Sequence, residues 1–127
     1  MANVLVDTSA WVDYFRKGEG PSAAHLDSLL DGRRAVLCGV VEMELLQGVR
    51  PEEKTMLRDL LAALPYIEAG REDYQAAGEL LAGLRAKGFR VPATDALIAA
   101  LCSRRSLSLL TLDKHFDLVH QVKKIKI

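Results

Sequence analysis

The sequence is poor in cysteine and has no excess of either charge. Its two cysteines, Cys38 and Cys102, lie in apolar stretches, and neither has a second cysteine or a histidine at metal-ligand spacing. We interpret both as small buried thiols in a reducing compartment, and no zinc site is predicted. Seventeen Lys and Arg residues balance seventeen Asp and Glu residues. This balance excludes a histone-like binder held by an overall positive field, but it does not exclude a nuclease that uses local basic patches.

Long apolar runs are also missing. Asp7 and Asp13 interrupt the first apolar residues early, so the N-terminus lacks the sustained apolar region of a secretory signal. No uninterrupted apolar segment is long enough to cross a bilayer. We therefore expect no membrane association and predict a soluble, cytoplasmic protein.

Hydrophobic residues are nevertheless abundant. They make up half of the 127 residues, which is enough for one domain with a true core. No internal repeat, low-complexity tract or linker divides the chain. The sequence therefore predicts a single domain over residues 1–127.

Short apolar runs rich in branched residues predict the strands. Val4 to Val6 and Ala35 to Cys38 are typical of strands buried in a parallel sheet. Leu107 to Leu112 is a third candidate, and Val122 to Ile127 is a candidate for a last, edge-like strand. Helical patterns lie between these runs. The alternation predicts an α/β fold with a central, mainly parallel sheet of four to five short strands flanked by helices.

Apolar stripes at helical spacing fill the rest of the chain. Trp11, Tyr14 and Phe15 share one face of the first predicted helix. The middle of the chain carries two further stripes, from Met56 to Leu64 and from Tyr74 to Leu84. We expect these two segments to pack together as a helical pair. Packing in the core is the first interpretation of all these stripes, and a groove for a partner is the alternative.

Acidic residues follow the predicted strands. Asp7 comes directly after the first strand, Asp113 comes just after the third, Asp95 opens an apolar helix, and Glu44 lies one short element beyond the second strand. In an open parallel sheet, functional side chains gather at the carboxyl ends of the strands. Four acids at one edge would repel one another unless a positive charge lay among them, and a divalent cation is the usual solution.

Each acid also has a simpler interpretation. Asp7, with the hydroxyl residues after it, is placed to cap the first helix, and Asp95 to complement the positive end of its own helix. Glu44 would then be a solvated helix residue and Asp113 a turn residue. Capping explains each position singly but does not explain the convergence. The alternative to an enzyme is therefore a non-catalytic interaction domain whose acids are structural.

Four short motifs occur in order along the chain. They are Val6-Asp7-Thr8-Ser9, Met43-Glu44-Leu45-Leu46-Gln47-Gly48, Thr94-Asp95-Ala96-Leu97-Ile98-Ala99-Ala100 and Leu110-Thr111-Leu112-Asp113-Lys114-His115-Phe116. Together they resemble the successive motifs of PIN-domain ribonucleases, in particular the VapC toxins of bacterial toxin–antitoxin pairs. The resemblance covers the whole chain. It implies a PIN-like domain that cleaves RNA, a small VapB-type antitoxin as its partner, and a homodimer.

The same resemblance implies roles for individual residues. The implied catalytic residues are four acids, Asp7, Glu44, Asp95 and Asp113. Three of them, Asp7, Asp95 and Asp113, are the implied metal ligands. Thr8 and Thr111 correspond to hydroxyl positions beside the acids, where a side chain orients a carboxylate, a water or a phosphate.

Two positions leave the acidic set open. Many relatives carry a second acid two residues after the one at Asp113, and this chain has His115 there, so the fourth carboxylate depends on Asp113 alone. Glu42 competes with Glu44, and only the match to the Glu-Leu-Leu-Gln-Gly pattern favours Glu44.

The residue types fit metal-assisted hydrolysis. Carboxylates are hard oxygen ligands for Mg²⁺, or Mn²⁺ as the alternative, and the held ion keeps open positions for a phosphate. Such an ion polarises a phosphodiester and lowers the pKa of a bound water, which attacks in line. The resemblance implies products with a 5′-phosphate and a 3′-hydroxyl. An aspartyl-phosphate mechanism is disfavoured, because Ser9 stands where that chemistry needs a second acid.

Overall fold

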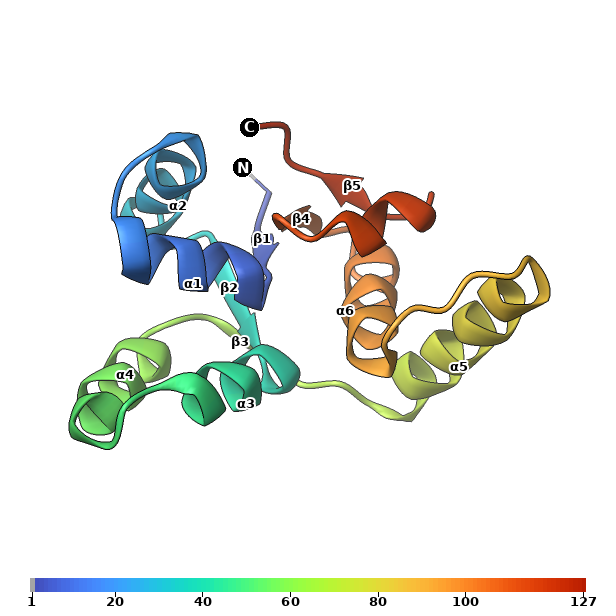
Figure 1. Cartoon of the computed structure of the whole chain (residues 1–127), viewed down its shortest axis with the longest axis horizontal. Coiled ribbons are helices and arrows are strands. Elements are labelled where there is room, and N and C mark those ends of the chain that lie inside the picture. Colours follow the sequence, from blue (N-terminus) through green and yellow to red (C-terminus); the bar gives the residue numbers. More distant parts are fainter. Residues whose placement is uncertain (1) are drawn as a thin grey trace.

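The computed structural model describes residues 2–127 as a five-stranded sheet with helices on both sides (Figure 1). The strands are β1 (Val4–Val6), β2 (Ala35–Cys38), β3 (Tyr66–Ile67), β4 (Ser108–Leu110) and β5 (Lys123–Lys124). Their order in the sheet is β3-β2-β1-β4-β5, and all four pairs of neighbours run parallel. The predicted α/β fold with a parallel sheet of short strands is therefore confirmed. β4 and β5 are shorter than the predicted runs from Leu107 to Leu112 and from Val122 to Ile127.

The helices lie on the two sides of the sheet according to their place in the chain. They are α1 (Thr8–Lys17), α2 (Pro21–Asp31), α3 (Gly39–Gly48), α4 (Lys54–Ala62), α5 (Arg71–Ala86) and α6 (Ala93–Arg104), with 3₁₀ turns η1 (Pro51–Glu53) and η2 (Lys114–Leu118). Figure 1 shows α1 to α4 on one side and α5 and α6 on the other. Right-handed crossovers require this arrangement, because the chain moves outward from β1 to β3 and then returns to β4. None of the helices in residues 2–127 has the length and apolarity needed to span a membrane.

The order in which the chain adds strands to the sheet reverses at β1, although all strands stay parallel. The first crossover leads from β1 to β2, whereas the later one brings β4 to the other side of β1. The backbone N–H of Asp7 donates to the carbonyl of Leu110, so the two strands stay paired up to their carboxyl ends. Ligands of open α/β sheets bind in the crevice outside the carboxyl ends of the strands at such a reversal. The topology therefore places Asp7 and the residues after β4 at the expected site.

The core lies between the sheet and the helices. All residues of β1 and β2 are buried, which is why these strands are continuous apolar runs. The indole of Trp11 is fully buried and stacks on the ring of Phe15, with 5.7 Å between ring centres. Residues 95–102 of α6 are buried on every side of the helix, because α6 packs against both the sheet and α5. The site acid Asp95 therefore stands on a rigid element.

The structure corrects the expectation for the middle of the chain. The segments from Met56 to Leu64 and from Tyr74 to Leu84 do not form a helical pair. The first lies mostly in α4, which packs against α3, and the second lies in α5, which packs against α6 on the other side of the sheet (Figure 1). The two-residue strand β3 separates them. A strand this short has no periodic signal in the sequence, so the crossover it creates was missed.

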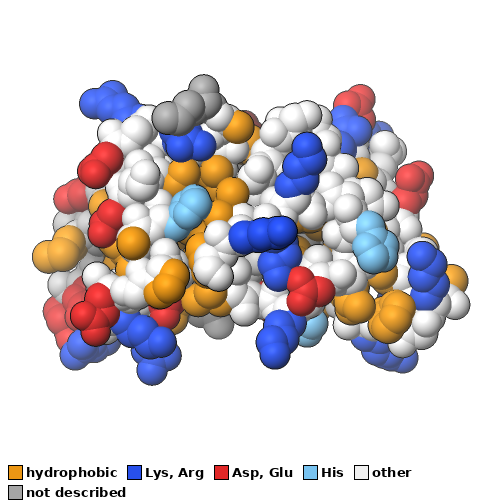
Figure 2. Space-filling model, turned by 90° about the horizontal axis from the view of Figure 1, so that it is seen from above, with side chains coloured by type: hydrophobic (Ala, Val, Ile, Leu, Met, Phe, Trp, Pro, Cys, Tyr) orange, Lys and Arg blue, Asp and Glu red, His pale blue; other side chains and the backbone are white. Residues whose placement is uncertain are grey.

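The face on which the chain termini lie carries charges of both signs. Figure 2 views this face from above Figure 1 and shows Lys and Arg side chains interspersed with Asp and Glu. This mixture agrees with the balanced composition of the chain. The acids of the predicted site belong to the opposite edge of the sheet, where β1 and β4 end.

Candidate active site

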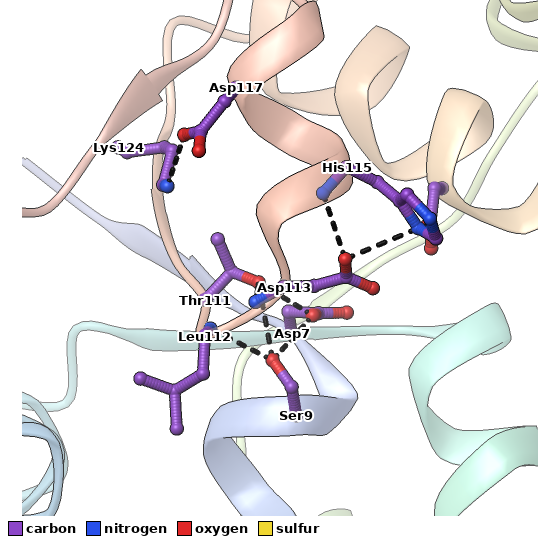
Figure 3. A network of polar contacts seen from close by, with 9 residues as sticks. Asp7, Ser9, Thr111, Leu112, Asp113, His115, Asp117 and Lys124 are labelled. Atoms are coloured by element: carbon purple, nitrogen blue, oxygen red, sulfur yellow. Dashed lines mark hydrogen bonds and ion pairs between the residues drawn. The ribbon is translucent and has the colours of Figure 1, made fainter. Parts of the chain in front are cut away.

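Asp7 is held by hydroxyl groups from two elements. It follows β1 and is 4% exposed, and its Oδ2 accepts hydrogen bonds from Thr111 Oγ1 and Ser9 Oγ, each at 2.8 Å (Figure 3). Asp7 occupies the N-cap position of α1, yet among residues 2–127 its carboxylate accepts no capping hydrogen bond from that helix. The carboxylate therefore faces the crevice, and the capping interpretation does not describe it.

Ser9 links the start of α1 to the segment that follows β4. Besides donating to Asp7, its Oγ accepts a hydrogen bond from the backbone N–H of Leu112 at 2.9 Å and lies 3.2 Å from Thr111 Oγ1. Thr111 Oγ1 in turn accepts from the backbone N–H of Asp113 at 3.0 Å. These hydroxyl groups set the position of Asp113 relative to Asp7. Ser9 was not among the residues predicted for the site, although its place two residues after Asp7 was the available signal.

Thr8 joins the first motif to the second. Its Oγ1 donates to Oε1 of Glu44 at 2.8 Å, which connects the first turn of α1 to the middle of α3. Glu42 lies two residues earlier, so it points to a different side of the helix. The negative charge of Glu42 acts instead on Tyr66, whose pKa is raised chiefly by burial and then by that charge. The structure thus brings Glu44, and not Glu42, beside the first motif.

Asp95, Asp113 and His115 form a cluster at the same edge. Nδ1 of His115 lies 3.1 Å from Oδ2 of Asp95 and 3.2 Å from Oδ1 of Asp113. The backbone N–H of His115 also donates to Oδ1 of Asp113 at 2.9 Å (Figure 3). One ligand atom from each of the three residues lies within 4.8 Å of the others. The histidine that departs from the acidic pattern therefore points into the site.

The carboxylates act on one another electrostatically. Burial raises the pKa of Asp95 above its usual range, the hydrogen bond from His115 opposes this shift, and the charges of Asp113 and Asp7 add to it. Burial also raises the pKa of the Cys38 thiol, and the charges of Asp7 and Glu44 contribute further. Each of the four predicted acids therefore interacts, by a hydrogen bond or electrostatically, with another residue at this edge of the sheet. Such a concentration of negative charge favours a bound cation.

The donor set fits a divalent cation. Asp95 and Asp113 offer carboxylate oxygens, the ligands that Mg²⁺ and Mn²⁺ prefer, and His115 adds an imidazole nitrogen. Asp7 is not one of these three clustered residues, and Thr111 links its carboxylate to Asp113 at the same edge. The hydroxyl groups of Thr111 and Ser9 orient the Asp7 carboxylate from behind, as outer partners of metal ligands do. The fold and the site together define an α/β domain with a cluster of acids at its switch point.

Comparison with known proteins identifies the family. The model of the PIN domain family matches residues 4–121. The chain is 31% identical over 128 residues to a VapC ribonuclease of Mycobacterium bovis, with 97% of this chain and 96% of the relative covered. The same values hold for Ribonuclease VapC11 of Mycobacterium tuberculosis. The chain belongs to the PIN-domain family and, within it, to the VapC ribonucleases.

Solved structures of the same fold include toxin–antitoxin complexes. DNA-bound VapBC from Salmonella typhimurium matches with a TM-score of 0.83 and 20% identity, covering 98% of each chain. VapBC2 from Rickettsia felis, bound to a promoter fragment, matches with a TM-score of 0.81 and 20% identity over 96% of each chain. At this identity the likeness establishes the fold. The resemblance that the four motifs carry is thereby confirmed at the level of sequence family and fold.

Proposed function

We propose that this chain is a metal-dependent endoribonuclease that acts as the toxin of a toxin–antitoxin pair. The observation that carries the proposal is the convergence of three acids at one edge, where Thr111 links Asp7 to Asp113 and His115 links Asp113 to Asp95. The chain is also 31% identical to VapC ribonucleases. In this proposal, residues 1–127 form one PIN-like domain that works in the cytoplasm.

Asp7, Asp95 and Asp113 are the proposed ligands of Mg²⁺ or Mn²⁺. A bound ion would polarise the scissile phosphodiester and lower the pKa of a water, and in-line attack by that water would leave a 5′-phosphate and a 3′-hydroxyl. Thr111 orients the Asp7 carboxylate and the Asp113 backbone through a single hydroxyl. His115 lies between the other two carboxylates and supplies a nitrogen beside them.

Glu44 is the proposed fourth acid. The Thr8 hydroxyl holds one oxygen of its carboxylate, which leaves the second oxygen to accept a hydrogen bond. We propose that this second oxygen of Glu44 orients the attacking water. A base or water-positioning group of this kind contributes about 10²- to 10⁴-fold to a rate.

The alternative of a non-catalytic domain with structural acids is less well supported. The Asp7 carboxylate bonds to Ser9 and Thr111, and the Asp95 carboxylate contacts His115. These partners come from the segment after β4 or from the first turn of α1. Local capping would have directed the carboxylates to the backbone of their own helices.

A VapB-type antitoxin is the proposed protein partner. A groove of about 790 Å³ lies between α1, α3 and α4, and its wall includes the exposed side chains of Phe15, Met56 and Leu60. Similar solved structures are VapBC complexes. We propose that an apolar segment of the antitoxin occupies this groove, because its apolar wall lies open to solvent. We also propose a homodimer, as the family resemblance implies.

Cleavage of pooled cellular RNA tests the nuclease proposal. The wild type should cut RNA in Mg²⁺ or Mn²⁺ and leave 5′-phosphate ends, and Asp95→Asn should abolish both the cuts and Mn²⁺ binding in calorimetry. Asp117→Asn is the matched control, because Asp117 pairs with Lys124 on the surface, away from the cluster. Undiminished cleavage in excess EDTA, or 2′,3′-cyclic phosphate ends, would contradict the mechanism.

A further inference from the structure

A separate pocket opens between α3, the β3–α5 connection and α6. Its volume is about 400 Å³, and its wall includes Cys38, Met43, Tyr66, Glu68, Tyr74 and Leu97. Tyr66 is 52% exposed and Tyr74 is 59% exposed, so neither residue is buried in the core. Volumes of this order accommodate small planar ligands. We call this region the tyrosine pocket.

The tyrosine pocket adjoins the acidic site. Cys38 lines the pocket and ends β2, which pairs with β1, the strand that Asp7 follows. The charges of Asp7 and Glu44 contribute to the raised pKa of the Cys38 thiol. Val40 also lines the pocket and lies one turn before Glu44 on the same face of α3. The pocket and the acids thus lie along the same end of the sheet, where neighbouring nucleotides of one RNA strand would contact both.

The chemistry of the wall favours an uncharged aromatic ligand. Within the described chain, no Lys or Arg lines the pocket, and Glu68 contributes a negative charge. A phosphate would be repelled there, whereas a base carries no charge. Tyrosine rings are stacking surfaces for unpaired bases. A carboxylate such as that of Glu68 accepts hydrogen bonds from the amino groups of bases.

Gly39 determines where Tyr66 lies. A Cβ atom built on Gly39 would be 2.9 Å from the Tyr66 hydroxyl oxygen, closer than real Cβ contacts allow. Gly39 begins α3 directly after Cys38, so the tyrosine rests on the backbone at the border of the acidic site. An Ala side chain at this position would displace the end of the Tyr66 ring and leave the backbone of α3 in place.

We propose that the tyrosine pocket binds an unpaired base of the RNA next to the scissile phosphate and so determines where the strand is cut. This inference rests on the proposed ribonuclease function and adds the subsite that selects the substrate. Tyr66 and Tyr74 are specificity-determining residues in this arrangement. The phosphodiester chemistry stays with the acids.

Binding of a fluorescent RNA tests the pocket without cleavage. The full-length Asp95→Asn protein is titrated with single-stranded RNA that the wild type cuts, carrying 2-aminopurine at one position at a time. Fluorescence should be quenched by stacking at one position beside the cleavage site. The quenching should be lost in Tyr66→Ala and Gly39→Ala and kept in Tyr66→Phe, since phenylalanine retains the ring.

Cleavage kinetics supply the second measurement. In the otherwise wild-type protein, Tyr66→Ala and Tyr74→Ala should lower kcat/KM on the preferred RNA about 5- to 100-fold, the range for one stacked base. The cuts should also spread to other sequences, while Tyr66→Phe keeps the original site. Circular dichroism confirms that each variant is folded.

The possible failures are distinguishable. A wild type that cuts no RNA would contradict the proposed function itself. A wild type that cuts RNA, with Ala variants that cut the same sites equally well and no position-specific quenching, would overturn only the base pocket. Ala variants that keep RNA selection but lose antitoxin binding would also overturn it and assign the pocket to the antitoxin.

Discussion

The hydroxyl of Thr111 donates a 2.8 Å hydrogen bond to Oδ2 of Asp7 and joins the carboxyl ends of β4 and β1 across 104 positions of sequence. The same oxygen accepts from the backbone N–H of Asp113. One buried hydroxyl thus orients two acids of the proposed site. Its donor and acceptor functions are both used, which makes it sensitive to substitution.

Thr111→Val keeps the shape of the side chain and removes this hydroxyl. We expect the free energy of unfolding to fall by about 1–3 kcal/mol, because the buried Asp7 carboxylate loses a donor and the Asp113 N–H loses its acceptor. Urea unfolding measures the change. Thr55→Val on the exposed surface of α4 is the control and should stay within about 0.5 kcal/mol of wild type. Equal stability of the two variants would contradict this role of Thr111.

Glu44→Gln and Glu42→Gln form a matched pair on α3. Glu44 accepts a hydrogen bond from Thr8 at the acidic edge, whereas the charge of Glu42 acts on Tyr66. We expect Glu44→Gln to lower kcat about 10²-fold or more. Glu42→Gln should change kcat by less than about 3-fold, since it lies outside the site. Equal losses in the two variants would show that the assignment of the acid is wrong.

His115→Asp places a carboxylate where this chain has an imidazole. His115 lies 3.1 Å from Asp95 and 3.2 Å from Asp113, so we expect it to contribute to the choice of the proposed cation. Imidazole suits Mn²⁺ better than Mg²⁺, and a carboxylate suits both. The ratio of Mn²⁺ to Mg²⁺ affinity, measured by calorimetry, should fall several-fold in His115→Asp. An unchanged ratio would show that His115 does not affect the choice of cation.

Asp73 carries a stability contribution that depends on pH. It is buried at the start of α5, accepts from the backbone N–H of Gly70, and binds Arg104 and Arg105 at the end of α6. The hydrogen bonds from Arg105 hold the pKa of the Asp73 carboxyl well below its usual range, against the opposing effect of burial. The lowered pKa means that the folded chain favours the ionised carboxylate.

The contribution of Asp73 is present above the unfolded-state pKa of about 3.9 and is lost as pH falls below it toward the lower folded-state pKa. Asp73→Asn should therefore be less stable than wild type by about 2 kcal/mol at pH 7. The difference should shrink as pH falls below about 4. Thermal unfolding from pH 7 to pH 2 tests this, and a difference that is constant with pH would contradict it.

Met56→Glu tests the groove proposed for the antitoxin. Met56 lines the groove and is 76% exposed, so a charge there should leave the fold intact. We expect antitoxin affinity to fall about 10-fold or more, as for a central interface residue, with an unchanged melting temperature. Ile127→Glu, at an exposed apolar residue outside the groove, is the control. Unchanged affinity in Met56→Glu would show that the antitoxin binds to another surface.

The sequence alone determined the framework of this protein. Val4 to Val6 and Ala35 to Cys38 could be predicted as buried strands, because a strand covered on both faces must be apolar at every position. The four motifs placed Asp7 and Asp113 at strand ends, and parallel topology brings such ends to one edge. Family membership followed from the same residues, since their order along the chain does not depend on how the intervening helices pack.

Tertiary structure decided which groups meet. β3 could not be predicted from its two residues, and without it α4 and α5 were wrongly expected to pair. The choice of Glu44 over Glu42 depends on which side of α3 faces Thr8, and local sequence does not contain that orientation. Contacts such as His115 with Asp95 join residues far apart in the chain. Only long-range packing brings such groups within hydrogen-bond distance, so they were seen only in the folded chain.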